Sequence, residues 1–244
     1  AGAGGIYATG MLSGNAGGTE TACAAAIETG ASLKPLLTGE VAAMAPRTQA
    51  NDLSGLTFND GDGNAITLAD TGGKPRLVNL WATWCAPCRA EMPALDALQA
   101  DKGGDDFEVV AISVDGGDDA KPRAFFEEIG IETLGFYHDP TIGAFNTMKK
   151  EGLAFGLPVT VLVDSQNCVV ANMNGPAEWS SEGGASLAIH FPTARRAMRW
   201  RPFATTLRLE ISLKYNSLTK SGAARRSHRF PLLHRNEGSC SIFP

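Results

Sequence analysis

Two cysteines separated by two residues, Cys85 and Cys88, are the strongest chemical signal in the chain. They follow an apolar run at 76–82 that predicts a strand, and they open a segment with helical spacing at 88–101. A helix N-terminus offers free backbone N–H groups and the positive end of the helix dipole, and both stabilise a thiolate. A Cys-x-x-Cys at such a place therefore predicts a dithiol–disulfide pair with a nucleophile of lowered pKa.

The two cysteines are expected to play different parts in thiol–disulfide exchange. The helix buries its later residues more than its first, so we expect Cys85 to attack a substrate disulfide and Cys88 to resolve the mixed disulfide. Pro87 falls in the first helical turn, where its missing N–H costs little. Trp84 directly precedes the nucleophile, which favours an apolar shield beside the sulfurs; the alternative is ordinary core packing.

The chain offers few residues for a metal site. The other cysteines, Cys23, Cys168 and Cys240, are far apart in sequence, and residues 1–182 contain only one histidine, His138. A structural zinc site needs a second cysteine pair or two histidines at ligand spacing. We therefore expect no bound metal.

Alternating strand and helix patterns surround the cysteine pair. Helical patterns lie at 20–45, 88–101, 118–130 and 141–150, and strand patterns lie at 56–60, 65–69, 76–82, 107–114, 136–137, 158–164 and 168–171. The first two strands flank an Asp/Gly/Asn turn and predict a hairpin. Alternation followed by a terminal hairpin predicts an α/β sheet of mixed strand direction, flanked by helices.

The charge of the chain is split between two regions. Residues 1–182 carry 10 Lys and Arg against 24 Asp and Glu, whereas residues 183–244 carry 11 against 2. We expect a flexible leader or anchor remnant at 1–19, a folded domain at 20–182 and a basic tail at 183–244. The tail is either a basic extension for an anionic membrane or acidic partner, or a frame-shifted, disordered segment. Its Arg225–Arg229 cluster alone does not predict nucleic-acid binding.

The segment 78–95 reads Val-Asn-Leu-Trp-Ala-Thr-Trp-Cys-Ala-Pro-Cys-Arg-Ala-Glu-Met-Pro-Ala-Leu. It resembles the active-site stretch of the TlpA/ResA/CcmG group of extracytoplasmic, thioredoxin-like thiol:disulfide oxidoreductases, and within that group the rhizobial TlpA type. The likeness covers about residues 50–180 and implies a thioredoxin-like fold with an N-terminal helical extension. After 175–179 the group continues with a helix on the sheet, which this chain lacks unless residues 187–197 replace it.

The resemblance assigns roles to further positions. Thioredoxins have a buried Asp where this chain has Asn79, and the group has instead an acidic residue at Glu91, which implies proton exchange with Cys88. The alternative for Glu91 is an exposed helix residue favoured by the dipole. Leu157 and Pro158 match the cis-proline segment of the fold; the alternative is a trans proline at a strand start. Pro93 matches the proline inside the active-site helix.

The resemblance also bears on the remaining cysteines. Rhizobial-type members carry an extra pair, one in the N-terminal extension and one in the late hairpin, which corresponds to Cys23 and Cys168. A disulfide there would close a loop of more than a hundred residues and contribute about 3–5 kcal/mol in the chain-entropy model. The alternative is two inert buried thiols. Cys240 is then left as a free thiol.

The function implied by the resemblance is a periplasmic, membrane-anchored, monomeric dithiol reductase that keeps copper-site cysteines reduced during cytochrome oxidase assembly. Its clients would be a copper chaperone or the oxidase copper-site subunit, its electron donor a membrane dithiol protein, and its only cofactor its own cysteines. The anchor would lie in a missing N-terminal segment, because no apolar run here is long enough to span a bilayer. The alternatives are an apocytochrome c reductase and a dithiol metal-binding chaperone.

Overall fold

The computed structural model describes residues 16–199, and the side chains of residues 23–190. Within this range the helices are α1 (Ala16–Leu33), α2 (Ala86–Lys102), α3 (Ala120–Ile129), α4 (Gly143–Lys150) and α5 (Glu182–Arg199). The strands are β1 (Ala45–Pro46), β2 (Thr57–Asn59), β3 (Ala65–Thr67), β4 (Arg76–Trp81), β5 (Glu108–Ser113), β6 (Tyr137–His138), β7 (Val159–Val163) and β8 (Val169–Asn174). Short 3-10 turns lie at Lys34–Leu36, Gly39–Val41 and Leu68–Thr71.

The strands form one mixed sheet in the order β1-β8-β7-β4-β5-β6-β2-β3. Strands β4, β5 and β6 run parallel, whereas β7 pairs antiparallel with β4, and β8 antiparallel with β7. Every residue of β4 and β7 is buried, as expected for strands covered on both faces. The predicted mixed α/β sheet, including the hairpin of β2 and β3, is confirmed.

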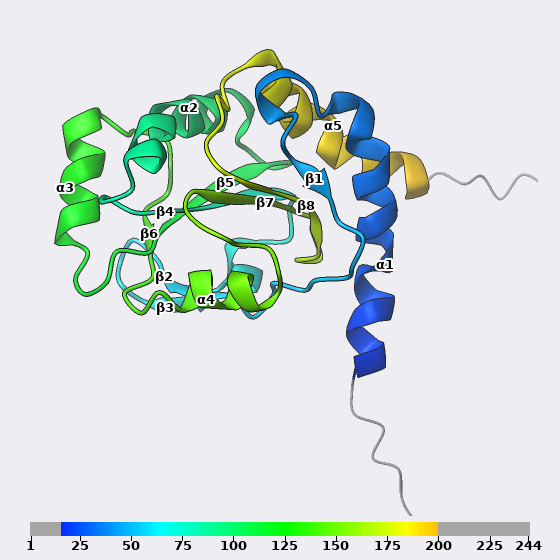
Figure 1. The fold of residues 1–244 in the computed structure, drawn as a ribbon, viewed down its shortest axis with the longest axis horizontal. Coiled ribbons are helices and arrows are strands. Elements are labelled where there is room, and N and C mark those ends of the chain that lie inside the picture. The colour runs from blue at the N-terminus through cyan, green and yellow to red at the C-terminus, as the bar shows by residue number, and fades with distance from the viewer. Residues whose placement is uncertain (1–15, 200–244) are drawn as a thin grey trace, which may run out of the picture. The chain divides into compact units, whose positions relative to one another are not determined.

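Helices cover both faces of the sheet. Figure 1 shows α2 and α5 on one face and α4 on the other, with α1 beside β8 at one end. An aromatic cluster fills the space under α3, where Trp81 stacks on Phe126 with ring centroids 5.3 Å apart, and Phe136 meets Phe126 edge-on at 5.6 Å. This packing fixes the end of β4, from which the chain runs directly into the cysteine pair.

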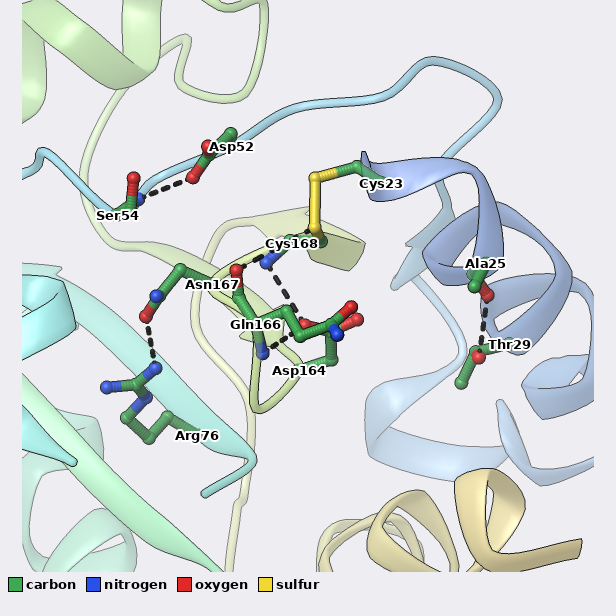
Figure 2. Close-up of a disulfide and its surroundings, with 10 residues drawn as sticks. All are labelled: Cys23, Ala25, Thr29, Asp52, Ser54, Arg76, Asp164, Gln166, Asn167 and Cys168. Atoms are coloured by element: carbon green, nitrogen blue, oxygen red, sulfur yellow. Dashed lines mark hydrogen bonds between the residues drawn. A yellow bond between two sulfur atoms is a disulfide. The ribbon is translucent and has the colours of Figure 1, made fainter. Parts of the chain in front are cut away.

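The N-terminal extension is tied to the sheet by a disulfide between Cys23 of α1 and Cys168 in the β7–β8 hairpin (Figure 2). Each of the two residues is 1% exposed. On the hairpin side, the carboxylate of Asp164 accepts the backbone N–H groups of Gln166 at 2.7 Å and of Cys168 at 3.2 Å. The expected pairing is therefore present, and the alternative of two separate thiols does not hold.

Helix α1 approaches β8 closely at a glycine. A Cβ atom on Gly30 would collide with the backbone carbonyl oxygen of Val170 in β8. Only glycine therefore allows this approach without movement of the helix, so Gly30 supports the same contact that the disulfide closes.

The structure adds an edge strand that the sequence pattern did not reveal. Pro46 directly follows the helical pattern at 20–45, where no strand was expected, yet Ala45 and Pro46 form β1 and pair with Asn172 and Ala171 of β8. Proline cannot donate a ladder hydrogen bond, and an edge position tolerates this. Sequence reasoning that treats proline as a breaker cannot distinguish an edge strand from a loop.

Helix α5 runs across the expected boundary between residues 182 and 183. It begins at Glu182 and continues to Arg199, and Leu187 and Ala188 are buried on the core. It contacts α1 and α2, so residues from 183 onwards supply the covering helix that the resemblance called for. The change in charge at residue 183 therefore does not coincide with the end of the folded region. Residues 1–15 and 200–244, with Cys240 and the basic cluster, lie outside the described residues.

Candidate active site

Cys85 and Cys88 form a disulfide at the N-terminus of α2, with their Cα atoms 5.3 Å apart. Strand β4 ends at Trp81, and a short turn closed by the Cys85 N–H on the Ala82 carbonyl, at 3.1 Å, leads into the helix. Cys85 is the N-cap residue, and its Sγ accepts the backbone N–H of Cys88 at 3.3 Å. The sulfur therefore takes the position at which a capping oxygen satisfies a free N–H of the first turn.

The exposure of the two cysteines agrees with the expected division of labour. Cys85 is 5% exposed and Cys88 is fully buried. Pro87 lies on the surface in the first turn of α2, as expected, and Pro93 lies inside the same helix. Solvent therefore reaches Cys85 but not Cys88, which favours Cys85 as the attacking group.

Glu91 lies on α2 one turn beyond Cys88 and is only 3% exposed, so the alternative of an exposed helix residue is wrong. Its Oε1 accepts the side-chain N–H of Asn79 at 2.9 Å. Its Oε2 accepts the backbone N–H of Ala177 and the indole N–H of Trp179, both at 3.1 Å. The segment after β8 therefore closes over a carboxylate of the active-site helix.

Asn79 links this carboxylate to the strand of the cis proline. Its amide donates both to Glu91 and to the Thr160 hydroxyl on β7, each at 2.9 Å. Asn79 and Thr160 are fully buried. Where thioredoxins have a carboxylate, this chain thus has the amide of Asn79. That amide donates a hydrogen bond to the carboxylate of Glu91 on α2.

Burial raises the pKa of Glu91 above its ordinary value of 4.5, and this outweighs the lowering effect of its bonds from Asn79, Ala177 and Trp179. A carboxyl group with a raised pKa can hold a proton nearer to neutral pH than an exposed one. A shallow depression of about 240 Å³, lined by Glu91 together with Glu40, Pro176 and Glu178, adjoins the group. The arrangement suits a group that gives and takes a proton.

Replacing Glu91 with glutamine is expected to remove a pH-dependent loss of stability. The folded state binds the Glu91 proton more tightly than the unfolded chain does, because its folded pKa is raised. This contribution is fully present below the unfolded pKa and is lost as the pH rises through the folded pKa. Urea unfolding between pH 4 and 8 should show the wild type losing stability relative to Glu91→Gln with rising pH. A difference that stays constant across this range would contradict the assignment, and Glu178→Gln, at an exposed position, is the control.

The cis proline lies on the same edge of the sheet as the cysteines. The Leu157–Pro158 peptide bond is cis, as expected. Val159, the first residue of β7, pairs with Leu80 near the end of β4, so Pro158 is close in register to the turn before Cys85. Two exposed aromatic residues lie close in sequence to these groups. Trp84, 68% exposed, directly precedes Cys85, and Phe155, 81% exposed, lies three residues before Pro158. Core packing for Trp84 is thus wrong, and Phe155 was not anticipated.

Sequence reasoning also missed Asp115, which follows β5. It is 5% exposed, and its carboxylate accepts the backbone N–H of Thr83 at 2.9 Å and the Thr83 hydroxyl at 2.6 Å. The available signal in the sequence was an acidic residue directly after a predicted apolar strand. The local sequence pattern does not identify Thr83 as the partner of Asp115, because 32 residues separate the two.

Metal ligands do not gather in the part of the chain that the structure describes. No group of three or more His, Cys, Asp or Glu side chains is close enough there to hold an ion.

Comparison with known proteins places this site in a broad family. The AhpC/TSA family model matches residues 41–178, which include the cysteine pair, Asp115 and the cis proline. The chain is 46% identical over 55 residues to the thiol-disulfide oxidoreductase ResA of Oceanobacillus iheyensis, covering 22% of this chain and 29% of that protein. It is 34% identical over 108 residues to the thiol:disulfide interchange protein DsbE of Pseudomonas aeruginosa, covering 43% and 53%. The chain thus spans between about a third and a half of the length of these curated relatives.

A solved structure shows the fold. A crystal structure from Chlorobium tepidum, described as that of a thiol:disulfide interchange protein DsbE, superposes with a TM-score of 0.50 at 22% identity. The match covers 59% of this chain and 96% of that one. The thioredoxin-like fold expected from the sequence is therefore confirmed, and the likeness to ResA and DsbE supports the TlpA/ResA/CcmG group.

Proposed function

From the premise that this chain belongs to the AhpC/TSA family of thioredoxin-like proteins, we propose that it is a thiol:disulfide oxidoreductase acting on the disulfides of client proteins. One observation carries the proposal. Cys85 caps the N-terminus of α2 with its sulfur on the Cys88 N–H, and Cys88 is buried one turn further on. A thiolate at Cys85 would receive the same N–H and the helix dipole, which favours its charged form.

The proposed reaction begins with the reduced pair. The Cys85 thiolate attacks one sulfur of the client disulfide; the client S–S bond breaks, and the other client sulfur leaves as a thiolate that takes up a proton. Cys88 then loses its proton and attacks the Cys85 sulfur. The mixed disulfide breaks, the Cys85–Cys88 bond forms, and the client departs with both cysteines reduced. Two electrons pass to the client, and another dithiol protein must restore the pair.

Glu91 is proposed to take the proton that Cys88 gives up. It is on the same helix, one turn beyond Cys88, and its raised pKa suits proton exchange nearer to neutral pH. Trp84, exposed and adjacent in sequence to Cys85, offers a client an apolar contact beside the nucleophile.

The finer proposal is a periplasmic reductase whose clients are the copper-site cysteines of cytochrome oxidase assembly, re-reduced by a membrane dithiol protein. The disulfide of Cys23 with Cys168 supports the rhizobial TlpA type, because it joins the two elements in which that type carries its extra pair. In the described part of the chain, no helix has both the length and the hydropathy needed to cross a membrane.

A redox titration of the Cys85–Cys88 pair tests the direction of transfer. Alkylation and intact mass would follow the pair against defined thiol buffers, with Cys240→Ser as the background to remove a further thiol. A midpoint near about −270 mV, similar to thioredoxin, is expected of a reductant. A midpoint near about −120 mV would mark an oxidant and contradict the reductase.

Client and metal experiments separate the alternatives. Reduced protein should reduce an oxidised copper-site peptide faster than an oxidised Cys-x-x-Cys-His peptide of apocytochrome c; the reverse order would favour the cytochrome c client. Tight, stoichiometric binding of Cu(I) or Zn²⁺ to the reduced pair would favour the metal chaperone over the oxidoreductase.

A further inference from the structure

The carboxyl ends of three parallel strands meet at the edge of the sheet that carries the cysteine pair. Strands β4, β5 and β6 are paired in parallel in that order. The turn to Cys85 follows β4, Asp115 follows β5, and His138 ends β6. Cys85, Asp115 and His138, which are 23 to 53 positions apart in sequence, therefore share this end of the sheet.

Asp115 holds the turn before Cys85 through Thr83. Its Oδ2 accepts the Thr83 backbone N–H at 2.9 Å, and its Oδ1 accepts the Thr83 hydroxyl at 2.6 Å. Thr83 stands two residues before Cys85, inside the turn that joins β4 to α2. Hydrogen bonds to a buried carboxylate are among the stronger ones in proteins, so this pair fixes both the backbone and the side chain of Thr83.

Asp115 is itself held from both sides. The Ser113 hydroxyl donates to its Oδ2 at 2.9 Å and also accepts its backbone N–H at 3.2 Å. The ring of His138 lies with Nε2 2.8 Å from the Asp115 carbonyl oxygen. A carbonyl oxygen only accepts, so this Nε2 carries the hydrogen. Ser113 of β5 and His138 of β6 therefore hold Asp115 in place. Its carboxylate is thus a rigid hydrogen-bond acceptor for the turn.

We infer that Asp115 is a positioning residue for the Cys85 nucleophile. The inference rests on the proposed function, in which Cys85 attacks the client. The carboxylate fixes Thr83 and so the turn that sets the Cys85 sulfur 3.3 Å from the Cys88 N–H. Without it, the turn has greater freedom, and the sulfur spends less time where the helix N-terminus stabilises its charge.

The experiment compares Asp115→Ala, Asp115→Asn and Thr83→Val, all with Cys240→Ser and with the Cys85–Cys88 pair selectively reduced. The readouts are the alkylation rate of Cys85 across pH 5 to 9 and the redox midpoint of the pair. At pH 7 the rate is expected to fall about tenfold in Asp115→Ala, the equivalent of one pH unit, with its profile moved to higher pH. Thr83→Val should show a smaller change in the same direction. Asp115→Asn keeps an acceptor without the charge and should stay close to wild type.

The chain contains a matched control at the end of β6. Asp139 is 3% exposed and accepts the backbone N–H of Thr141 at 2.9 Å and the Thr141 hydroxyl at 2.6 Å. These bonds match those between Asp115 and Thr83, but they hold the start of α4 rather than the turn at Cys85. Asp139→Ala and Thr141→Val should therefore lower stability while leaving the alkylation profile and the midpoint unchanged.

Three results would overturn the inference. One is an unchanged profile and midpoint in folded Asp115→Ala or, if that variant does not fold, in Thr83→Val. Another is an equal change in the Asp139 and Thr141 variants, which would indicate general loosening. The third is an Asp115→Asn variant as slow as Asp115→Ala, because a hydrogen-bond acceptor at this position would then not be what fixes the turn. Because Cys85 alkylation needs no client, these results stand apart from a failure of the wild-type protein to reduce client disulfides.

Discussion

Replacing Cys88 with serine is expected to convert the protein into a trap that remains covalently bound to its clients. Cys85 can still attack a disulfide, but no neighbouring thiol can then resolve the mixed disulfide. Resolution within one molecule has an effective concentration far above that of any thiol in solution, so turnover should fall by about three orders of magnitude or more. Non-reducing gels and intact mass should show a one-to-one adduct that a strong reductant releases.

Cys85→Ser is the matched control for the trap. It should form no adduct, because the remaining thiol at Cys88 is fully buried, whereas Cys85 is 5% exposed. Both variants carry Cys240→Ser, so that the remaining cysteine of the pair is the one thiol under test. An adduct through Cys88 in Cys85→Ser, with none in Cys88→Ser, would reverse the roles assigned to the two cysteines.

Removing the disulfide of Cys23 with Cys168 is expected to cost the largest amount of stability of any change considered for this fold. The two residues are 145 apart in sequence, and closing a loop of that length contributes about 5 kcal/mol in the chain-entropy model. Cys23→Ala with Cys168→Ala should therefore lower the urea midpoint strongly. Activity at low temperature should persist, because neither residue belongs to the dithiol pair.

The other disulfide provides the comparison. Cys85 and Cys88 are three apart, so the same treatment gives about 2 kcal/mol for Cys85→Ala with Cys88→Ala. Equilibrium urea unfolding of both double variants against the oxidised wild type, each with Cys240→Ser, measures the two losses. Equal losses would show that the long loop does not act through the entropy of the unfolded chain.

Part of the candidate site could be predicted from the sequence because its signals are local. The spacing of Cys85 and Cys88, the apolar strand before them and Pro87 in the first turn all lie within a dozen residues. Helix geometry alone then places Cys85 at the N-terminus and buries Cys88. The same local logic predicted the mixed sheet, since alternation of strand and helix constrains how strands can pair.

The environment of Glu91 could not be predicted from its own segment. Its hydrogen-bond partners come from β4 and from the residues after β8, with Trp179 lying 88 positions further along the chain. Burial in the folded chain sets the upward direction of its pKa shift, against the lowering effect of these hydrogen bonds. A sequence pattern gives the helix face of a residue but not what covers that face.

Tertiary packing also determined the structure of segments for which the sequence pattern indicated something else. The charge change at residue 183 predicted a tail, yet Leu187 and Ala188 are buried in the core within α5. The apolar face of a helix is stabilised by such packing whatever the net charge of its segment. Pro46 lies outside every predicted strand but fits an edge strand. Asp115 directly follows the predicted strand at 107–114, and its carboxylate accepts two hydrogen bonds from Thr83 in the turn before Cys85.

The sequence by itself thus determined the cysteine pair that is proposed to react and the order of the elements that carry it, since both follow from spacing along the chain. The tertiary structure decided which groups surround that pair and which partners those groups have. Glu91 acquires its partners, and Asp115 acquires Thr83, only because the sheet brings strand ends together that are tens of residues apart. Proton affinity and the rigidity of a turn depend on burial and on hydrogen bonds, and both are properties of the packed chain.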